Sequence, residues 1–230
     1  PLTTEEKKTS EYINDLAEAQ KEVGSMQWLA LKTRPDIACI AAIAASCQTR
    51  NPKEAKRMMQ GTWKYLAATR DMCMTIIPDN NVNYFIEISA DASYAPGGDR
   101  SRTGVVIKVL GVIVHWCSNK QSITSVSSCE SELSSAVTGI KLGLGIRQVV
   151  EEMLETCVPM NLNQDNMACI QTLLNEITSW RSRHYALRAA WVRDMIHQEQ
   201  IVVSHERGVL ITADGLTKIL QKIKLAEMRE

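Results

Sequence analysis

The spacing of the apolar residues changes near residue 73, and this change limits what the chain can fold into. Before it, apolar residues recur every three to four positions, with breaks at Pro35 and Pro52, which predicts three helices. After it, short β-branched and aromatic runs are separated by Gly, Pro and Asn, which predicts strands. We therefore expect a small helical bundle over residues 1–72 and a second domain over residues 73–230.

The second domain opens with runs that predict the strands of an antiparallel meander: 72–78, 82–91, 103–111 and 111–118. The Leu110-Gly111 step predicts a tight hairpin between the last two runs. The elements expected next are a long helix over about 128–156, a strand near 160–165, helices near 167–177 and 184–198, a strand over 200–205 and a last helix from about 211. Helices between the later strands require parallel additions to the meander. The predicted fold class is therefore α/β (α+β), with a mixed sheet flanked by helices.

The composition says less about partners than about the fold. The chain carries 26 Lys and Arg against 26 Asp and Glu, and this balance neither supports nor excludes a polyanionic ligand. Its seven cysteines are scattered without a Cys-x-x-Cys spacing, which argues against a disulfide framework or a zinc site and predicts an intracellular protein. No apolar run is long enough to cross a bilayer, so we expect no membrane contact.

Four carboxylates stand where this order of elements could bring them together. Asp91 and Asp165 end predicted strands, and Glu132 lies in the first turns of the long helix. Asp214 lies near the start of the last helix. Each has a simpler interpretation by itself, because an Asp at a strand end is usually a solvated turn residue or a helix cap, and Asp214 suits the positive end of a helix. Only the set of four predicts a site.

Glu130 competes with Glu132 as the helical member of this set. Residues two apart on a helix project about 200° from each other, so at most one of the two faces the sheet. The face of Glu132 carries Ala136, Gly139 and Gly143, small residues that let the helix approach the sheet closely. The face of Glu130 is mixed and more solvated, with Ser134, Val137 and Lys141. We therefore select Glu132; the alternative is a surface Glu in a Ser-rich helix start.

A cluster of four carboxylates is typical of a site for hard divalent cations. Mg²⁺ takes oxygen ligands and keeps water or substrate phosphate in its other positions. Two such ions about 4 Å apart activate a water and stabilise the leaving oxygen in phosphodiester hydrolysis. Crowded carboxylates repel and shift one another's pKa unless a cation lies among them. The predicted cofactor is therefore a pair of Mg²⁺ ions, with Mn²⁺ as a substitute.

The chain also resembles a known family through an ordered series of segments. "TRPDIACIAAIAASCQTRNP" and "MMQGTWKYLAATRD" are followed by "SADASYA", "RSRTGVVI", "VHWCSNKQSITSVSSCESELSSAV", "NQDNMACI", "SRHYALRAAWVRDMI" and "TADGLTKIL". In this order the segments are similar to the end of the reverse transcriptase and the ribonuclease H domain in the Pol polyproteins of copia-type (Pseudoviridae-like) LTR retrotransposons. The resemblance covers about residues 24–220.

The resemblance implies a ribonuclease H-like five-stranded mixed sheet, preceded by a thumb-like or connecting segment of reverse transcriptase. The acidic quartet of the family falls on the same four residues that the element order selects: Asp91, Glu132, Asp165 and Asp214. Two departures stand out, because Ser93 replaces a second Asp that the family usually has, and "SSCESEL" stands for the family's "SSTEAEY". Neither departure removes a proposed metal ligand.

The activity that the resemblance implies is that of a ribonuclease H, which cleaves the RNA strand of an RNA–DNA hybrid during retrotransposon reverse transcription. The implied products are a 3′-hydroxyl and a 5′-phosphate. The implied partners are the hybrid and the remainder of the reverse transcriptase and Pol polyprotein, within a cytoplasmic virus-like particle or the nucleus. One alternative is a non-catalytic module that only binds nucleic acid or a partner, and the intact quartet argues against it. Another is a two-metal nuclease or transposase that acts on DNA.

Several further residues are candidates for contact with nucleic acid: Lys120, Gln121, Ser127, Ser128, Asn166, Arg183 and His184. Backbone amides at the first four precede Glu132 and could hold a phosphate of the substrate strand, although turn and cap duty is the simpler account. For Arg183 and His184 the alternative is a basic helix start on the surface. His205 follows the last strand and is a candidate for assisting metal release or proton transfer.

Overall fold

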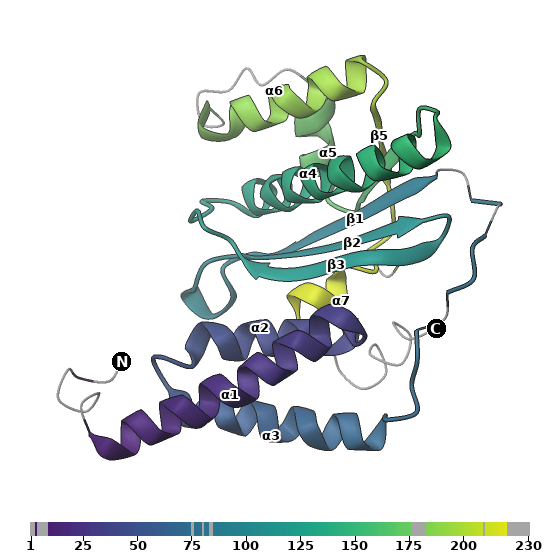
Figure 1. Cartoon of the computed structure of the whole chain (residues 1–230). Coiled ribbons are helices and arrows are strands. Elements are labelled where there is room, and N and C mark those ends of the chain that lie inside the picture. Colours follow the sequence, from purple (N-terminus) through teal and green to yellow (C-terminus); the bar gives the residue numbers. More distant parts are fainter. Residues whose placement is uncertain are drawn as a thin grey trace. The chain divides into compact units, whose positions relative to one another are not determined.

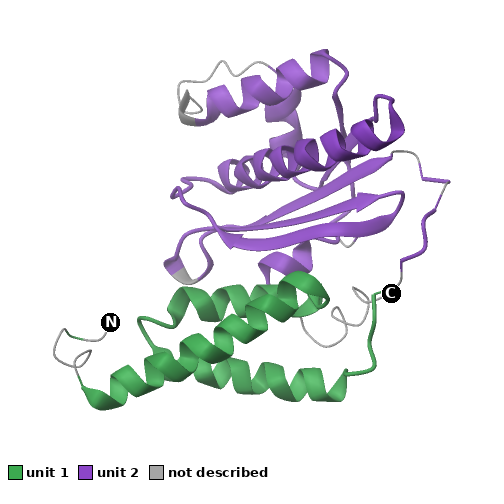
Figure 2. Ribbon diagram, viewed as in Figure 1, with its two compact units in different colours: residues 1–75, 219–230 green, residues 76–218 purple. Residues whose placement is uncertain are grey.

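The computed structural model describes residues 3, 9–74, 76–79, 81–82, 85–175, 183–208 and 210–219, without the side chains of Gly97, Arg183 and His184. The chain forms two compact units, one of residues 1–75 with 219–230 and one of residues 76–218 (Figure 2). Over its described residues the first unit is helical, and the second combines a sheet with helices. None of the helices in this part of the chain is both long and apolar enough to cross a membrane.

The first unit contains the three helices that the sequence predicts, with a short 3₁₀ turn before the second. These elements are α1 (Ser10–Lys32), η2 (Pro35–Ile37), α2 (Ala38–Cys47) and α3 (Pro52–Ala68). Thr9 caps α1 and Asn51 caps α3, because each side-chain oxygen accepts a hydrogen bond from a backbone amide three residues later. Pro52 suits the first position of α3, where its missing N–H costs no helical bond.

A buried ion pair ties the turn before α2 to the end of α3. Arg34 donates hydrogen bonds to Asp36 at 2.9 and 2.7 Å, and Tyr65 donates to the same carboxylate at 2.6 Å. Arg34 also donates to the hydroxyl of Thr69 at 2.8 Å. Burial raises the pKa of Asp36, but the hydrogen bonds from Arg34 and Tyr65 outweigh it and hold the pKa below its ordinary value. Polar contacts therefore join the bundle as well as apolar packing.

The second unit is built on a mixed five-stranded sheet, which confirms the predicted fold class (Figure 1). Its strands are β1 (Ile86–Ser93), β2 (Arg102–Val109), β3 (Val112–Lys120), β4 (Met160–Gln164) and β5 (Ile201–His205), in the order β3-β2-β1-β4-β5. The first three are antiparallel neighbours, and β4 and β5 add in parallel beside β1. The predicted hairpin between β2 and β3 is confirmed, since Leu110 and Gly111 both have positive φ, 49° and 76°.

Helices cover both faces of this sheet. They are α4 (Ser128–Leu154), α5 (Met167–Leu174), α6 (Arg183–His197) and the short α7 (Asp214–Thr217), and a 3₁₀ turn, η3 (Pro96–Gly98), lies between β1 and β2. Figure 1 shows α4 and α6 on one face and α7 on the other. The core between α4 and the sheet is made by alternate apolar residues of the strands, among them Ile86, Ile88 and Ile107, and by Leu133 and Ile140 of α4.

Two glycines let α4 lie close to the sheet, as the small-residue face predicts. A Cβ atom at Gly139 would lie 2.8 Å from Ile88 Cγ2, and one at Gly143 would lie 2.6 Å from Ile88 Cδ1. Both distances are shorter than ordinary carbon contacts. The helix backbone therefore packs directly on the side chain of Ile88, and this packing fixes the depth at which the rest of α4 sits.

One predicted element is wrong, and a second is found with different bounds. Residues 72–78 were expected as a strand, but none of the described ones is in a strand, and Ile76 and Ile77 are 72% and 73% exposed. The physical reason is that Pro78 lacks the N–H needed for a ladder and the two isoleucines find no apolar partner there. The helix expected from about 211 begins only at Asp214 and ends at Thr217, and residues 220–230 lie outside the described part.

The close approach at Gly139 predicts opposite effects for one substitution at two positions of α4. Gly145→Ala should raise the free energy of unfolding by about 0.5–1 kcal/mol, because Ala is the better helix former and nothing lies within 4 Å of the new Cβ. Gly139→Ala should lower it by about 1–2 kcal/mol, because overpacking against Ile88 exceeds the same gain. Urea unfolding of both variants measures the difference, and equal effects would contradict the packing argument.

Candidate metal centre

The parallel pairing of β1 with β4 brings two of the predicted acids to one edge of the sheet. Asp91 lies near the carboxyl end of β1, and Asp165 directly follows β4. Because these strands run in the same direction as neighbours, their carboxyl ends lie side by side. Asp91 is buried, with 3% of its surface exposed, and Asp165 is half-buried.

The start of α4 supplies the third acid and separates the roles of its two glutamates. Glu130 accepts a hydrogen bond from the amide of Val126 at 2.8 Å, while its own amide donates to Ser127 Oγ at 3.1 Å. Ser127 is the N-cap, and Glu130 reaches back to the amide of the residue before it, in a variant of the capping box, so Glu130 closes the end of the helix. Glu132 instead places a carboxylate oxygen with those of Asp91 and Asp165, all within 4.8 Å of one another. The helical face chosen from the sequence is the one that joins this group.

Crowding and burial shift the acidity of this group. Burial raises the pKa of Glu132 to about 8, and the charges of Asp91 and Asp165 push it in the same direction. Burial likewise raises the pKa of Asp91, against a hydrogen bond from Thr217. Three carboxylates in this position are costly without a cation among them. Their oxygen-only donor set fits a hard divalent cation, so the three are the residues that would hold one.

Asp214 lies beside this group without being one of its three members. It begins α7, and its charge raises the pKa of Asp91. Its Oδ1 accepts a hydrogen bond from Lys218 Nζ at 2.5 Å. Burial lowers the pKa of Lys218, but the bond to Asp214 and the surrounding carboxylates outweigh it and raise the pKa. The fourth predicted acid is therefore paired with a lysine at the rim of the cluster.

Gly104 allows α7 to reach the cluster, and the sequence analysis did not select it. It pairs with Asp91 across β1 and β2, so the two residues face the same side of the sheet. A Cβ at Gly104 would lie 2.7 Å from the carbonyl oxygen of Ala213 and 2.8 Å from Cγ2 of Thr217. With this space open, the Thr217 hydroxyl donates a hydrogen bond to the carboxylate of Asp91. A glycine inside a strand is the signal that could have indicated such a close approach.

Three other residues help to position the acids and were also not predicted. Gln164 is fully buried; its Oε1 accepts from the amide of Asp165 at 2.9 Å and its Nε2 donates to Glu132 at 3.5 Å. Ser135 Oγ donates to the carbonyl oxygen of Asp91 at 2.8 Å. A Cβ at Gly208, in the loop after β5, would lie 2.8 Å from Asp165 Oδ2. No sequence pattern marks these residues, because their roles depend on neighbours distant in the chain.

The predicted nucleic-acid contacts largely make local structural bonds. Ser127 and Asn166 are the N-caps of α4 and α5, and the Ser128 carbonyl accepts a bond from Ser131. Gln121 is buried and donates to Thr103 and to the Ser131 carbonyl, while Lys120 pairs with Asp99 at 2.6 Å. The side chains of Arg183 and His184 lie outside the described residues, and His205 is exposed at the end of β5. The proposed contacts of these residues with nucleic acid stay predictions. The auxiliary role of His205 also stays a prediction.

Comparison with known proteins gives the chain its relatives. No protein-family model matches it. The retrovirus-related Pol polyprotein from transposon TNT 1-94 of Nicotiana tabacum is 24% identical over 210 residues, which are 90% of this chain and 16% of that polyprotein. The corresponding polyprotein from transposon RE2 of Arabidopsis thaliana is 25% identical over 214 residues, 92% of this chain and 14% of that one. The chain thus spans only 16% and 14% of the length of these two curated relatives.

Among solved structures, LC11-RNase H1, isolated from compost, is similar with a TM-score of 0.44 and 16% identity. That similarity covers 57% of this chain and 91% of LC11-RNase H1. The polyprotein relatives cover far more of the chain, across both of its compact units. Over nine tenths of its length, the chain is therefore related to a segment of the Pol polyproteins of copia-type retrotransposons, as its ordered series of motifs indicates.

Proposed function

We propose that the chain is a metal-dependent endonuclease, a ribonuclease H that hydrolyses the RNA strand of RNA–DNA hybrids during retrotransposon reverse transcription. The observation that carries this proposal is the group of three carboxylates within 4.8 Å at the joined ends of β1, β4 and α4. The similarity to Pol polyproteins supports the reverse-transcription context. We further propose that residues 1–72 belong to the thumb or connection of the polymerase and help to hold the hybrid.

Each residue of the site has a task that follows from its contacts. Asp91, Glu132 and Asp165 would hold divalent cations, with Mg²⁺ or Mn²⁺ suited to their oxygen atoms. When bound, a pair of such ions supplies an activated water and stabilises the leaving oxygen of a phosphodiester. Asp214 extends the acidic rim, and its bond to Lys218 keeps its carboxylate oriented beside Asp91. The 2′-hydroxyl distinguishes the RNA strand as the one to be cut.

The protein also keeps the acids from relaxing away from one another. Thr217 holds the Asp91 carboxylate from α7, and Gln164 lies between Glu132 and the backbone of Asp165. Such supporting hydrogen bonds fix ligand orientation, and their loss typically costs about 10- to 100-fold in metal affinity or activity. The unit therefore presents the carboxylates preorganised for a cation rather than gathering them when one binds.

The first test removes one carboxylate of the group. Asp91→Asn should reduce cleavage of a labelled RNA–DNA hybrid in Mg²⁺ by at least about 100-fold, because several kcal/mol of transition-state stabilisation depend on the cation site. Single-turnover rates with gel analysis of the products measure this loss. Asp194→Asn, the same change at an exposed position of α6, should keep the wild-type rate.

Three results would contradict the proposed function. Hybrid cleavage that survives in Asp91→Asn would show that the carboxylate group is not the active site. Cleavage of duplex DNA in preference to the hybrid would favour a nuclease or transposase that acts on DNA. A wild-type chain that binds the hybrid without cutting it in Mg²⁺ or Mn²⁺ would favour the non-catalytic binding module.

The raised pKa of Glu132 predicts how metal removal changes stability with pH. Because the folded pKa, about 8, lies above the ordinary value, the protonated group stabilises the fold at low pH, and this contribution is lost as pH rises toward 8. In EDTA the free energy of unfolding should therefore fall by about 3 kcal/mol more between pH 5 and 8 in the wild type than in Glu132→Gln. Adding Mg²⁺ at pH 8 should restore the stability of the wild type.

The matched control for this experiment is Glu152→Gln, an exposed glutamate on the same helix, which should follow the wild-type pH dependence. Denaturant unfolding at a series of pH values gives the three curves. If Glu132→Gln lost stability with pH as steeply as the wild type, Glu132 would not be the group that titrates in the cluster.

A further inference from the structure

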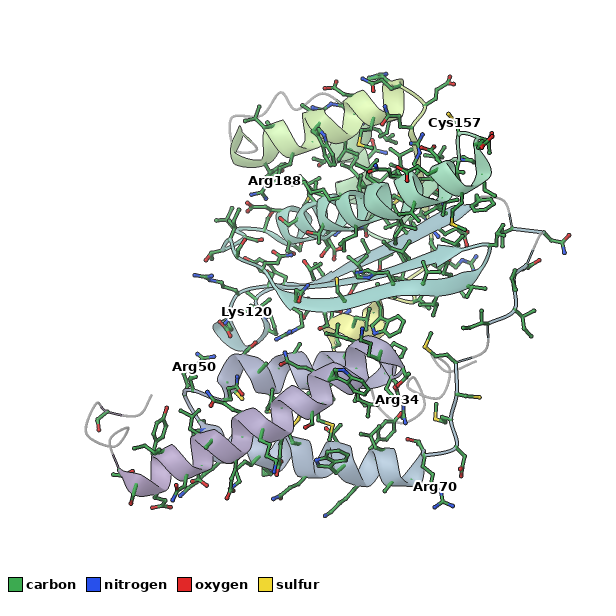
Figure 3. All side chains as sticks on the ribbon, viewed as in Figure 1. Arg34, Arg50, Arg70, Lys120, Cys157 and Arg188 are labelled. Atoms are coloured by element: carbon green, nitrogen blue, oxygen red, sulfur yellow. The ribbon has the colours of Figure 1, made fainter. Side chains whose placement is uncertain are left out.

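A second polar site lies on the face of α4 that the sequence assigns to solvent. A pocket of about 410 Å³ opens between this face, the end of β3 and α6. Its polar lining includes Lys120 and Asn119 from β3, Ser134, Thr138 and Lys141 from α4, and Arg188 from α6. We call these six residues the basic pocket. Figure 3 labels Lys120 and Arg188, which reach it from opposite sides.

The charge of the basic pocket is positive and only partly compensated. Lys120 pairs with Asp99 at 2.6 Å, and Lys141 lies over the ring of Trp191 with its Nζ 5.9 Å from the ring centre. Among the described residues that line the pocket, none carries a carboxylate. No carboxylate of a described residue lies within ion-pair distance of Lys141 or Arg188. Two cations therefore face the pocket without an anionic partner from this part of the chain.

The arrangement of the hydrogen-bonding groups favours an anionic ligand. Arg188 donates one N–H to Ser134 Oγ at 3.0 Å, which holds the half-buried guanidinium against α4. Ser134 and Thr138 already donate their hydroxyl protons to backbone carbonyls one turn earlier. The remaining N–H groups of Arg188 and the ammonium of Lys141 are donors that only an acceptor can satisfy. A phosphate offers several acceptor oxygens and a charge that matches this pair.

The pocket and the carboxylate group lie on different sides of the same helix and are joined by short contacts. Thr103, which also lines the pocket, shares a hydrogen bond of 2.9 Å with Ser135, and Ser135 donates to the backbone of Asp91. Ser134 stands two residues from Glu132 and so projects about 200° away from it. The basic pocket therefore lies near the carboxylate group, across α4, without being part of the metal centre.

We propose that the basic pocket binds a phosphate of the nucleic-acid backbone that flanks the cleavage point. This inference rests on the proposed function in one respect, because it takes nucleic acid as the substrate. Lys141 and Arg188 are the residues that would contact the phosphate, and Ser134 positions Arg188. Such contacts attract a polyanion regardless of its sequence and in the absence of metal, whereas the three carboxylates repel it.

The test measures binding separately from cleavage. Fluorescence anisotropy with a labelled RNA–DNA hybrid in EDTA gives the Kd of the full chain at several salt concentrations without turnover. Lys141→Gln with Arg188→Gln should weaken binding about tenfold, which is the loss of one to two charge-assisted hydrogen bonds. The slope of log Kd against log salt concentration should fall by about one for each cation removed.

Matched variants separate phosphate binding from a general effect on the fold. Lys108→Gln, on β2 and outside the pocket, should leave the Kd and the salt slope unchanged. Arg188→Lys retains the charge but loses the planar fork, so it should weaken binding while keeping the slope. Circular dichroism and thermal unfolding identify any variant that fails to fold. If the double variant does not fold, the Kd and salt slope are measured for Lys141→Gln alone, because Lys141 is exposed.

The outcomes distinguish this proposal from the proposed function. The proposal is wrong if the folded double variant keeps the wild-type Kd and salt slope, whether or not the chain cuts the hybrid. If only Lys141→Gln folds, the same result in that variant contradicts the proposal. Weakened binding in a chain that never cleaves the hybrid would support phosphate binding at the basic pocket and contradict the proposed ribonuclease activity. Titration with inorganic phosphate and a nucleoside monophosphate forms the second arm. If these ligands bind in a Lys141-dependent way while hybrid binding is unaffected, the pocket takes a free phosphate compound and the backbone proposal is wrong.

Discussion

Three carboxylates held within 4.8 Å of one another repel, and the second unit gives them little freedom to move apart. Asp91 and Asp165 are fixed by the parallel pairing of β1 with β4, and Glu132 is fixed by the packing of α4 on the sheet. Burial and then the charges of neighbouring carboxylates raise the pKa values of Asp91 and Glu132, which shows the cost of holding these acids together. A bound cation offsets such a cost, and a purely structural role would not, which is why the crowding itself supports a cation site.

The site depends on its glycines, which have no side chain, as much as on its carboxylates. Gly139 and Gly104 let α4 and α7 approach opposite faces of the sheet, and Gly208 leaves room for the carboxylate of Asp165. A Cβ at any of the three would lie within 3 Å of a neighbouring heavy atom. Each glycine thus brings a different element to the cluster. Any other residue at these positions would push the helix, strand or loop away from its neighbour. The close packing of the backbone therefore fixes where the carboxylates lie.

The sequence predicts the parts of this structure that depend on local pattern and fails where distant contacts decide. The change of period separates helices from strands, and the small-residue face of α4 selects Glu132 over Glu130, which instead caps the helix. The apolar run at 72–78 resembles a strand, yet Ile76 and Ile77 find no sheet edge to join. Gln164 could not be selected, because a buried amide acquires its role only when β4 meets α4. For Gly104 the sequence offered only the general signal of a glycine inside a strand, and its partner α7 became evident in the structure.

The two faces of α4 carry opposite charges, with Glu132 on one and Lys141 on the other. On the proposed function, Glu132 belongs to a cluster that would repel a nucleic-acid backbone until a cation offsets its charge, whereas Lys141 on the other face would attract the same backbone with or without the cation. A site that had only the carboxylates would need metal both to bind and to cut. With attraction placed on a separate face, the polyanion can be held there even before a cation offsets the repulsion of the carboxylates. On the proposed mechanism the metal would then serve the chemical step, and substrate and cation would not compete for one set of charges.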